Sequence, residues 1–223
     1  MFSYKTLSEL PTVWSDLELI KRRQRKETLR EVYVEGEQRL FKRYIINTKT
    51  VFYSRPWALE AKALEQAKGL PVPKYLATYA GLGEHGYQEF VFERTFLPGT
   101  RIDLVSAKVV EEMAKLLAAL HRRGIVTHDA TIDNFIQSPT RSLCFIDFGK
   151  ARIHRLPFYY DIGSELARFL HGTLLYDEHL WRLFLDRYIR ARRIEYVSKA
   201  IEQFFFRFCK RSRMRRRALN SSR

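Results

Sequence analysis

One stretch of the sequence, Val126 to Arg152, constrains the fold more than any other; it reads VTHDATIDNFIQSPTRSLCFIDFGKAR. It places Asp129, Asn134 and Asp147 beside apolar runs that have the composition of short buried strands. Burying an unpaired charge is costly, so a core position for these side chains is disfavoured.

The spacing of these three residues has a chemical meaning. Asn134 follows Asp129 by five residues, and Asp147 opens the tripeptide Asp-Phe-Gly, 18 residues after Asp129. This pattern resembles the catalytic loop and metal-binding turn of the protein-kinase-like fold. The resemblance implies that Asp129 orients and deprotonates an acceptor hydroxyl, while Asn134 and Asp147 hold Mg²⁺. The alternative is that Asp129 and Asp133 are solvated loop acids and Asp147 is a turn former.

The same resemblance predicts a lysine on an early strand, paired with a glutamate on the following helix. Lys42 lies in the strand-like segment RLFKRY, and Glu60 follows 18 residues later. Glu60 is favoured over Glu65 because it shares a helical face with alanine and leucine, whereas Glu65 lies between two lysines. The resemblance assigns the ATP phosphates to Lys42. In the alternative, Lys42 and Glu60 are ordinary surface charges.

Periodicity predicts a β-rich first third and a mainly helical remainder. The first third contains a hairpin over Leu29–Ile46, a helix from Pro56 to Gly69 and a strand pair over Tyr75–Phe96. The later helices are expected over Ser106–Gly124, Tyr160–Leu170, Glu178–Arg192 and Tyr196–Cys209. We therefore expect an α+β, two-lobed protein-kinase-like fold, with a nucleotide-binding lobe over 1–97 and a catalytic lobe over 98–223. Backbone groups near Glu93 to Thr95 are expected to meet the adenine edge of ATP.

The sequence departs from the usual kinase pattern at several positions. There is no glycine-rich phosphate loop, and the corresponding segment, Lys21–Arg30, is cationic. Its arginines can bind phosphate as charges, but a merely solvated basic loop fits equally well. Thr127 stands where kinases have a histidine, and we interpret the adjacent His128 as structural.

The segment after Asp-Phe-Gly is short. Asp161 follows Asp147 by 14 residues and resembles the buried aspartate that braces the catalytic loop in this fold. This distance leaves no room for a long, peptide-docking activation segment. A short segment is characteristic of small-molecule and lipopolysaccharide kinases and of the smallest atypical protein kinases.

From about Glu31 to Arg217 the chain resembles the bacterial lipopolysaccharide core kinases that phosphorylate heptose or 3-deoxy-octulosonate. The similar segments are VYVEGEQRLFKRY, EAKALEQAKGLPVPK, FLPGT, LHRRGIVTHD and the arginine-rich end. The resemblance implies an ATP- and Mg²⁺-dependent kinase acting on a core sugar. One alternative is a small atypical protein kinase or ATPase of the tRNA-modification type; another is a non-catalytic basic scaffold.

Charge indicates the kind of partner. The formal net charge is +15, and eight Lys or Arg residues but no acid follow from Arg207 onward. Such an excess favours anionic partners: a phosphorylated sugar acceptor, an acidic membrane surface or, as an alternative, nucleic acid. With no signal-like start and no long apolar run, we expect a cytoplasmic protein, peripheral on the inner face of the bacterial inner membrane. The phenylalanines of FFFRF are expected to anchor the last helix and to leave Arg213, Arg215, Arg216 and Arg217 in solvent.

Overall fold

The structure is a computed structural model that describes residues 3–25, 28–46, 55–83, 86–140, 142–155, 159–194 and 196–221. The chain forms two compact units. The first comprises Met1–Lys68 and Val72–Pro98, and the second comprises Gly69–Pro71 and Gly99–Arg223. The first is β-rich and the second is mainly helical, which confirms the expected α+β class.

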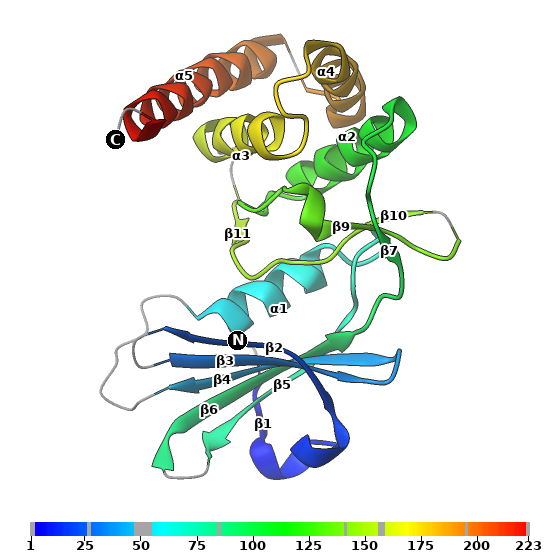
Figure 1. Ribbon diagram of the computed structural model, residues 1–223, viewed down its shortest axis with the longest axis vertical. Helices are drawn as coiled ribbons and strands as arrows, with labels where there is room; N and C mark the ends of the chain where they lie inside the picture. Colours follow the sequence, from blue (N-terminus) through cyan, green and yellow to red (C-terminus); the bar gives the residue numbers. More distant parts are fainter. Residues whose placement is uncertain are drawn as a thin grey trace. The chain divides into compact units, whose positions relative to one another are not determined.

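The first unit is built on a sheet of the order β1-β5-β6-β4-β3-β2 (Figure 1). The strands are β1 Lys5–Thr6, β2 Glu18–Arg25, β3 Thr28–Glu35, β4 Arg39–Ile46, β5 Tyr75–Leu82 and β6 Gln88–Thr95. Strands β1 and β5 are parallel, and the other neighbours are antiparallel. Short 3₁₀ turns at Leu7–Glu9 and Trp14–Asp16 connect β1 to β2. The hairpin expected to turn near Gly36 is confirmed by the β3–β4 pairing.

The basic segment 21–30 is not the loop that we expected. Lys21–Arg25 belong to β2 and Thr28–Arg30 to β3, and the two strands pair from Lys21 opposite Val32 to Arg25 opposite Thr28. Lys26 and Glu27 lie outside the described residues. Antiparallel pairing satisfies the backbone groups of this segment, and its side chains at Lys21 to Gln24 are exposed.

Helix α1, Pro56–Gln66, packs against β5 and β6 of the sheet (Figure 1). Pro56 stands in its first turn, as expected, because that position has no helical acceptor for a backbone N–H. Trp57 is 1% exposed, and its ring stacks on Phe90 with the ring centroids 4.1 Å apart. This contact fixes the start of α1 on the sheet.

The second unit contains four helices among the residues that the structure describes, together with short strands. The helices are α2 Ala107–Arg122, α3 Tyr159–Gly172, α4 Glu178–Arg192 and α5 Tyr196–Ser221. The strands are β7 Thr100–Arg101, β8 Ile125–Val126, β9 Phe135–Gln137, β10 Leu143–Phe145 and β11 Arg152–Ile153. They form a sheet of order β10-β9-β7 and a separate β8–β11 pair.

Two helix pairs form the core of this unit. Helix α2 packs against α4, and α3 packs against α5 (Figure 1). The second pair approaches closely because α3 carries Gly163, where a Cβ atom would lie 2.8 Å from the backbone of Phe205. Helix α2 buries the predicted stripe of Val110, Met113, Leu117 and Leu120 completely. Ser106 caps it as expected, accepting a hydrogen bond from the backbone N–H of Val109.

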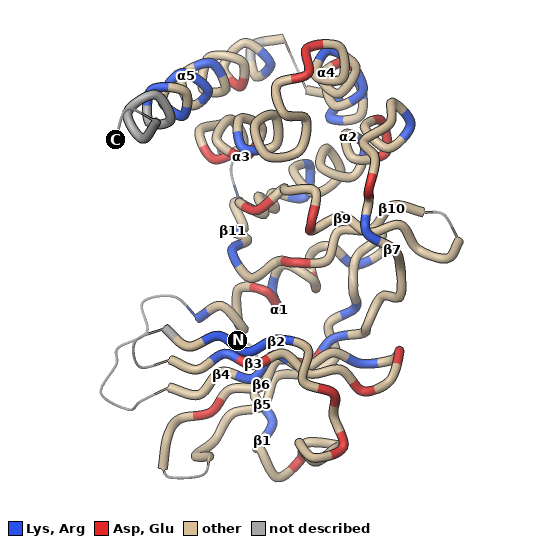
Figure 2. Tube along the Cα trace, in the orientation of Figure 1, with Lys and Arg blue, Asp and Glu red and all other residues tan. Residues whose placement is uncertain are grey.

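Helix α5 differs from the expectation in length and in packing. It continues to Ser221 instead of ending at Cys209, so the basic segment is helical (Figure 2). Phe205 contacts Tyr160 and Phe206 stacks on Trp181, as expected for anchors, but Phe204 and Phe208 are 63% and 56% exposed and do not anchor the helix. Successive helical residues point about 100° apart, and three consecutive phenylalanines cannot all face one core. The side chains of Arg216 and Arg217 lie outside the described part of the structure.

No helix among the described residues is both long enough and apolar enough to span a membrane.

Candidate active site

The first unit contains a buried ion pair. Lys42 on β4 places its Nζ atom 2.7 and 2.8 Å from the two carboxylate oxygens of Glu60 on α1. The side chains of Lys42 and Glu60 are 4% and 0% exposed, whereas Glu65 is exposed. The ion pair expected from the sequence is therefore present, with the expected glutamate.

Strand alternation explains why Lys42 meets α1. Side chains two apart along a strand share a face, so Lys42 faces the same way as Tyr44. The ring of Tyr44 contacts Trp57 at the start of α1, with the centroids 5.3 Å apart. Lys42 therefore points toward the helix that carries Glu60. A second cation, Arg94, is also buried, and its Nε atom lies 3.9 Å from Glu60 Oε1.

Glu93 does not lie where the adenine contact was expected. It is inside β6, opposite Phe41 of β4 and Ala77 of β5, so both sides of its backbone face neighbouring strands. Its buried carboxylate accepts hydrogen bonds from the Tyr79 hydroxyl at 2.7 Å and from Arg39 at 3.4 Å. Burial, together with the Glu93 carboxylate, raises the pKa of Tyr79 above its ordinary value. The Glu93 side chain therefore makes its hydrogen bonds within the sheet.

The chain leaves this sheet later than expected. The backbone N–H of Thr95 donates to the Lys74 carbonyl at 2.9 Å, and that of Phe96 donates to the Gln38 carbonyl at 2.8 Å. The backbone donors of Thr95 and Phe96 are therefore already used. A backbone N–H donor to adenine is therefore not available at Thr95 or Phe96.

In the second unit, the β9–β10 hairpin brings Asn134 and Asp147 together. Asn134 ends a 3₁₀ turn, Ile132–Asn134, directly before β9, and Asp147 comes two residues after β10. The strands pair with Phe135 opposite Phe145, and the Ile146 N–H donates to the Asn134 carbonyl at 3.0 Å. The backbones of Asn134 and of the residue before Asp147 are thus hydrogen-bonded neighbours.

Asn134 also links this hairpin to Asp129. Its side-chain Nδ2 donates to the backbone carbonyl of Asp129 at 2.8 Å. This bond fixes the amide orientation and turns Oδ1, the oxygen that can ligate a hard cation, away from the Asp129 carbonyl. One carboxylate oxygen of Asp147 accepts from the Gly149 N–H at 3.1 Å, which orients that carboxylate. Hydrogen bonds around the β9–β10 hairpin therefore link the backbone positions of Asp129, Asn134 and the residue before Asp147.

Two cations that sequence reasoning missed contact Asp129. Lys150 Nζ lies 2.8 Å from Oδ2, and Arg168 Nη1 lies 3.6 Å from Oδ1. Arg168 also donates to the His128 carbonyl. The Lys150 side chain is 62% exposed and that of Asp129 is 20% exposed, so solvent reaches this pair. Lys150 could have been suspected because it directly follows Asp-Phe-Gly; Arg168 carries no such signal.

A buried network holds the catalytic loop from beneath. Thr127 donates from its backbone N–H and its hydroxyl to Glu165 of α3, and its hydroxyl accepts from the Asp129 N–H at 3.3 Å. Glu165 also pairs with His121 Nε2 at 2.6 Å, and His121 Nδ1 pairs with the Tyr188 hydroxyl at 2.6 Å. Thr127, Glu165 and His121 therefore form a continuous hydrogen-bonded chain that reaches the backbone of Asp129.

The charge of Glu165 depends on this network. Complete burial alone would raise its pKa, but the hydrogen bond and charge of His121, the hydroxyl of Thr127 and the charge of His128 outweigh burial and lower it. Glu165 is thereby held as a carboxylate, which is the form that accepts the Thr127 hydrogen bonds. Asp161, expected to brace this loop, is buried at the start of α3 and lies 3.8 Å from His128, and Glu165, one helical turn later, adds the hydrogen bonds to Thr127.

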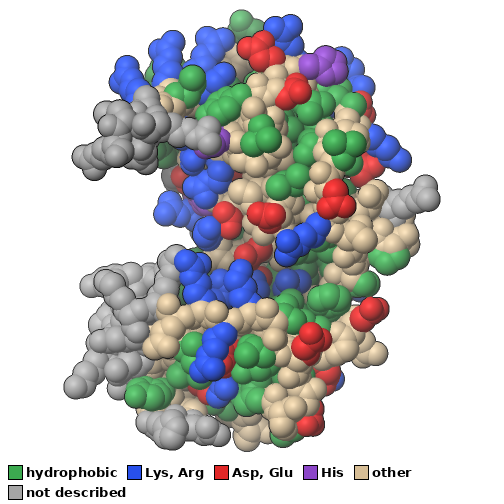
Figure 3. Space-filling model, in the orientation of Figure 1, with side chains coloured by type: hydrophobic (Ala, Val, Ile, Leu, Met, Phe, Trp, Pro, Cys, Tyr) green, Lys and Arg blue, Asp and Glu red, His purple; other side chains and the backbone are tan. Residues whose placement is uncertain are grey.

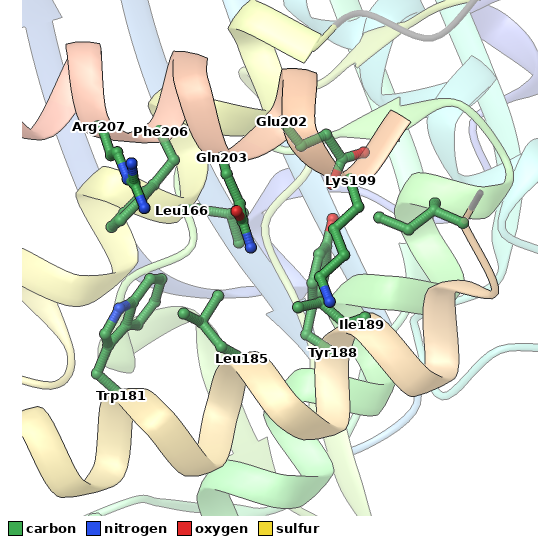
Figure 4. Close-up of a pocket in the computed structure, with 11 residues that line it drawn as sticks. Leu166, Trp181, Leu185, Tyr188, Ile189, Lys199, Glu202, Gln203, Phe206 and Arg207 are labelled. Carbon is green, nitrogen blue, oxygen red and sulfur yellow. The ribbon is translucent and has the colours of Figure 1, made fainter. Parts of the chain in front are cut away.

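A cavity of about 220 Å³ lies among α3, α4 and α5 (Figure 4). Its lining is mostly apolar, with Trp181 and Leu185 projecting from α4 and Phe206 from α5, while Lys199 and Arg207 add positive charge. Tyr188, which contacts His121, forms part of the wall. The cavity wall is therefore joined by hydrogen bonds to the network beneath Asp129.

Comparison with known proteins shows the fold. No protein-family model matches the sequence, and no characterised protein sequence matches it either. Among solved structures, monomeric WbdD superposes with a TM-score of 0.50 at 18% identity, over 70% of this chain and 44% of WbdD. This chain has a protein-kinase-like fold. WbdD bound to the kinase inhibitor LY294002 superposes with a TM-score of 0.46 at 17% identity, over 83% of this chain and 49% of that one. The chain thus spans less than half the length of the WbdD chains.

Proposed function

We propose that this protein is an ATP- and Mg²⁺-dependent phosphotransferase that acts on a hydroxyl of a lipopolysaccharide core sugar, heptose or 3-deoxy-octulosonate. The observation that carries the proposal is the convergence of Asp129, Asn134 and Asp147 at the β9–β10 hairpin. A general base beside two oxygen ligands for a hard cation is the arrangement that phosphoryl transfer requires.

Each residue has a defined part in the proposed reaction. Asp129 orients the acceptor hydroxyl and takes its proton, and Lys150 and Arg168 hold the Asp129 carboxylate in place. Asn134 and Asp147 supply an amide oxygen and a carboxylate to Mg²⁺. When bound, Mg²⁺ offsets the negative charge of the ATP phosphates. Lys42, fixed by Glu60, contributes a positive charge to the same phosphates.

The short segment after Asp-Phe-Gly supports a small acceptor. Arg152 and Ile153 form β11, which pairs with β8 beside the catalytic loop, and α3 already begins at Tyr159. An extended peptide would need a longer segment on which to dock. The net charge of +15 supports an acceptor that carries phosphate or carboxylate groups.

Purified protein, ATP, Mg²⁺ and dephosphorylated core oligosaccharide provide the direct test, with the products read by mass spectrometry. We expect one phosphoryl group to appear on the sugar with wild type and with Asp133→Asn, which changes an exposed loop acid, but not with Asp147→Asn. Transfer of phosphate to protein instead of sugar would overturn the proposal that the acceptor is a sugar, and it would favour an atypical protein kinase. Binding of ATP with no turnover would overturn catalysis and favour a scaffold.

We further propose that α5 brings the protein to an anionic membrane surface at the inner face of the inner membrane. Along one face of α5, Arg207, Arg211 and Arg215 are exposed beside Phe204 and Phe208. Lys and Arg side chains gather over this helix in Figure 3. Arginines interspersed with exposed aromatic side chains are typical of helices that lie in a membrane interface. This surface supports a peripheral location in the cytoplasm.

Liposome co-sedimentation tests the membrane proposal. Changing the three exposed arginines of α5 to Gln should weaken binding to anionic vesicles at low salt by about 1 kcal/mol per residue. Screening should shrink this difference at high salt. The matched control changes Arg182, Arg190 and Arg193 to Gln. These three arginines are exposed and lie on α4 or directly after it. Equal loss in both triple variants would make the effect one of net charge and would remove α5 from the proposal.

A further inference from the structure

Three potential metal ligands outside the proposed Mg²⁺ site lie close together in the second unit. They are His128, between β8 and Asp129, His154, directly after β11, and Asp161, in the first turn of α3. One ligand atom from each lies within 4.8 Å of the other two. Asp161 Oδ2 is 3.2 Å from His154 Nε2 and 3.8 Å from His128 Nε2.

The backbone holds His128 in an uncommon conformation. Its φ of 55° lies in the left-handed region, which is unfavourable for a residue with a Cβ atom. Arg168 donates to its carbonyl, which keeps the backbone turned in this way. Within the part of the chain that is described, His128 Nε2 is buried and makes no hydrogen bond. Asp161 Oδ2 lies 3.8 Å from this nitrogen.

The spacing of these atoms fits a tetrahedral ion. Zn²⁺ binds imidazole nitrogen and carboxylate oxygen at about 2.0–2.2 Å, so two ligand atoms on one tetrahedron lie about 3.4 Å apart. The separations of 3.2 and 3.8 Å bracket that value. The two histidine ligand atoms lie within 4.8 Å of each other, so the side chains would have to close by at most about 1.4 Å to surround one ion.

The charges around the cluster are compatible with a divalent cation. Burial lowers the pKa of His128, against the charges of Glu165 and Asp161, and it lowers the pKa of His154, against the charge of Asp161. Arg152 lies 3.9 Å from Asp161 Oδ2, but its side chain is 65% exposed. It can turn into solvent when a cation binds. Arg168 and Glu165 also face His128 and supply opposite charges.

We propose that His128, His154 and Asp161 bind one Zn²⁺ ion, with a water molecule as the fourth ligand. Two imidazoles and one carboxylate suit Zn²⁺ better than Mg²⁺, which prefers oxygen ligands. The ion joins the residue before Asp129, the short segment after Asp-Phe-Gly and the start of α3. Zinc therefore clamps the catalytic loop to the segment that replaces a long activation loop.

Binding of Co²⁺, a spectroscopic substitute for Zn²⁺, tests the site in the full chain. Protein freed of metal with a chelator is titrated with Co²⁺ in millimolar Mg²⁺, which occupies sites built from oxygen ligands. We expect one equivalent of Co²⁺ to give the visible absorption of a tetrahedral complex and Zn²⁺ to displace it. Failure of wild type to bind either ion at micromolar concentration would overturn the proposal, whatever its kinase activity.

Two variants tie binding to these residues. His154→Ala removes a ligand but keeps the backbone hydrogen bond from the residue 154 N–H to the Gly124 carbonyl, so the fold should persist by circular dichroism. Asp161→Asn keeps the side-chain shape if His154→Ala proves unstable. Each should weaken Zn²⁺ binding at least about 100-fold, because loss of even an outer-shell partner costs 10–100-fold. His179→Ala, at an exposed histidine of α4, is the matched control. Wild-type affinity in both ligand variants would overturn the assignment.

Discussion

The two ion pairs assigned to the proposed reaction, one in each unit, differ in their access to water. Lys42 and Glu60 in the first unit are almost completely buried, whereas Asp129 and Lys150 in the second unit are partly solvated. A buried pair is fixed because either charge alone would be strongly disfavoured, and an exposed pair can exchange its partner for water or substrate. The first pair therefore serves as a rigid fixture, and the second has the freedom that a reacting group needs.

The largest effect should come from the solvated pair. Asp129→Asn removes the proposed base without changing side-chain shape, so phosphoryl transfer should fall at least about 100-fold, the lower bound for general base catalysis, while ATP binding persists. Asp133→Asn, at an exposed position in the same loop, should retain activity. Steady-state turnover and equilibrium ATP binding measure the two properties. A more damaging Asp133 change would mean that the catalytic base is assigned to the wrong aspartate.

The buried pair should dominate stability. Glu60→Ala leaves the Lys42 ammonium buried without its carboxylate, so the free energy of unfolding should fall by about 3–5 kcal/mol. Denaturant unfolding measures this loss. Glu65→Ala, on the exposed face of the same helix, should change it by less than about 0.5 kcal/mol. Similar losses in both variants would show that burial of the Lys42–Glu60 pair does not make it important for stability.

Glu165 should make the catalytic unit sensitive to acid. Its folded-state pKa lies below the ordinary 4.5, so its contribution to stability is complete above pH 4.5 and is lost as the pH falls through the folded-state value. Glu165→Gln should lower the free energy of unfolding by about 1–3 kcal/mol at pH 7 and reduce the dependence of that free energy on pH below 4.5. Unfolding curves from pH 3 to 7 compare the variant with wild type. An unchanged acid dependence would show that Glu165 is not the titrating group.

The smallest stability effect belongs to the exposed partner of Asp129. Lys150→Ala should change the free energy of unfolding by less than about 1 kcal/mol, because a solvated pair contributes little. Turnover should still fall, because the Asp129 carboxylate loses its closest cation. Lys115→Ala, at an exposed lysine of α2, controls for loss of surface charge. Equal turnover in the two variants would remove Lys150 from the proposed site.

Local patterns were sufficient for most elements, but not for the strands over 21–30 or for the length of α5. The α2 stripe is buried and Ser106 caps that helix. The Lys42–Glu60 pair was expected from the resemblance to kinases, and helical periodicity selected Glu60 over Glu65. The position of Glu93 inside β6 was not predictable. The residue at which a strand leaves its sheet depends on hydrogen bonds to residues distant in sequence, here to the carbonyls of Lys74 and Gln38.

The sequence by itself determined the alternation of strands and helices and the order of Asp129, Asn134 and Asp147, because these depend on residues a few positions apart. The tertiary structure alone decided which groups surround them. Glu165 reaches Thr127 across 38 residues and Lys150 reaches Asp129 across 21, and no local period relates such positions. Helix packing brought Glu165 beneath the catalytic loop, because burying the apolar faces of α2, α3 and α4 leaves their few polar groups only one another as hydrogen-bond partners.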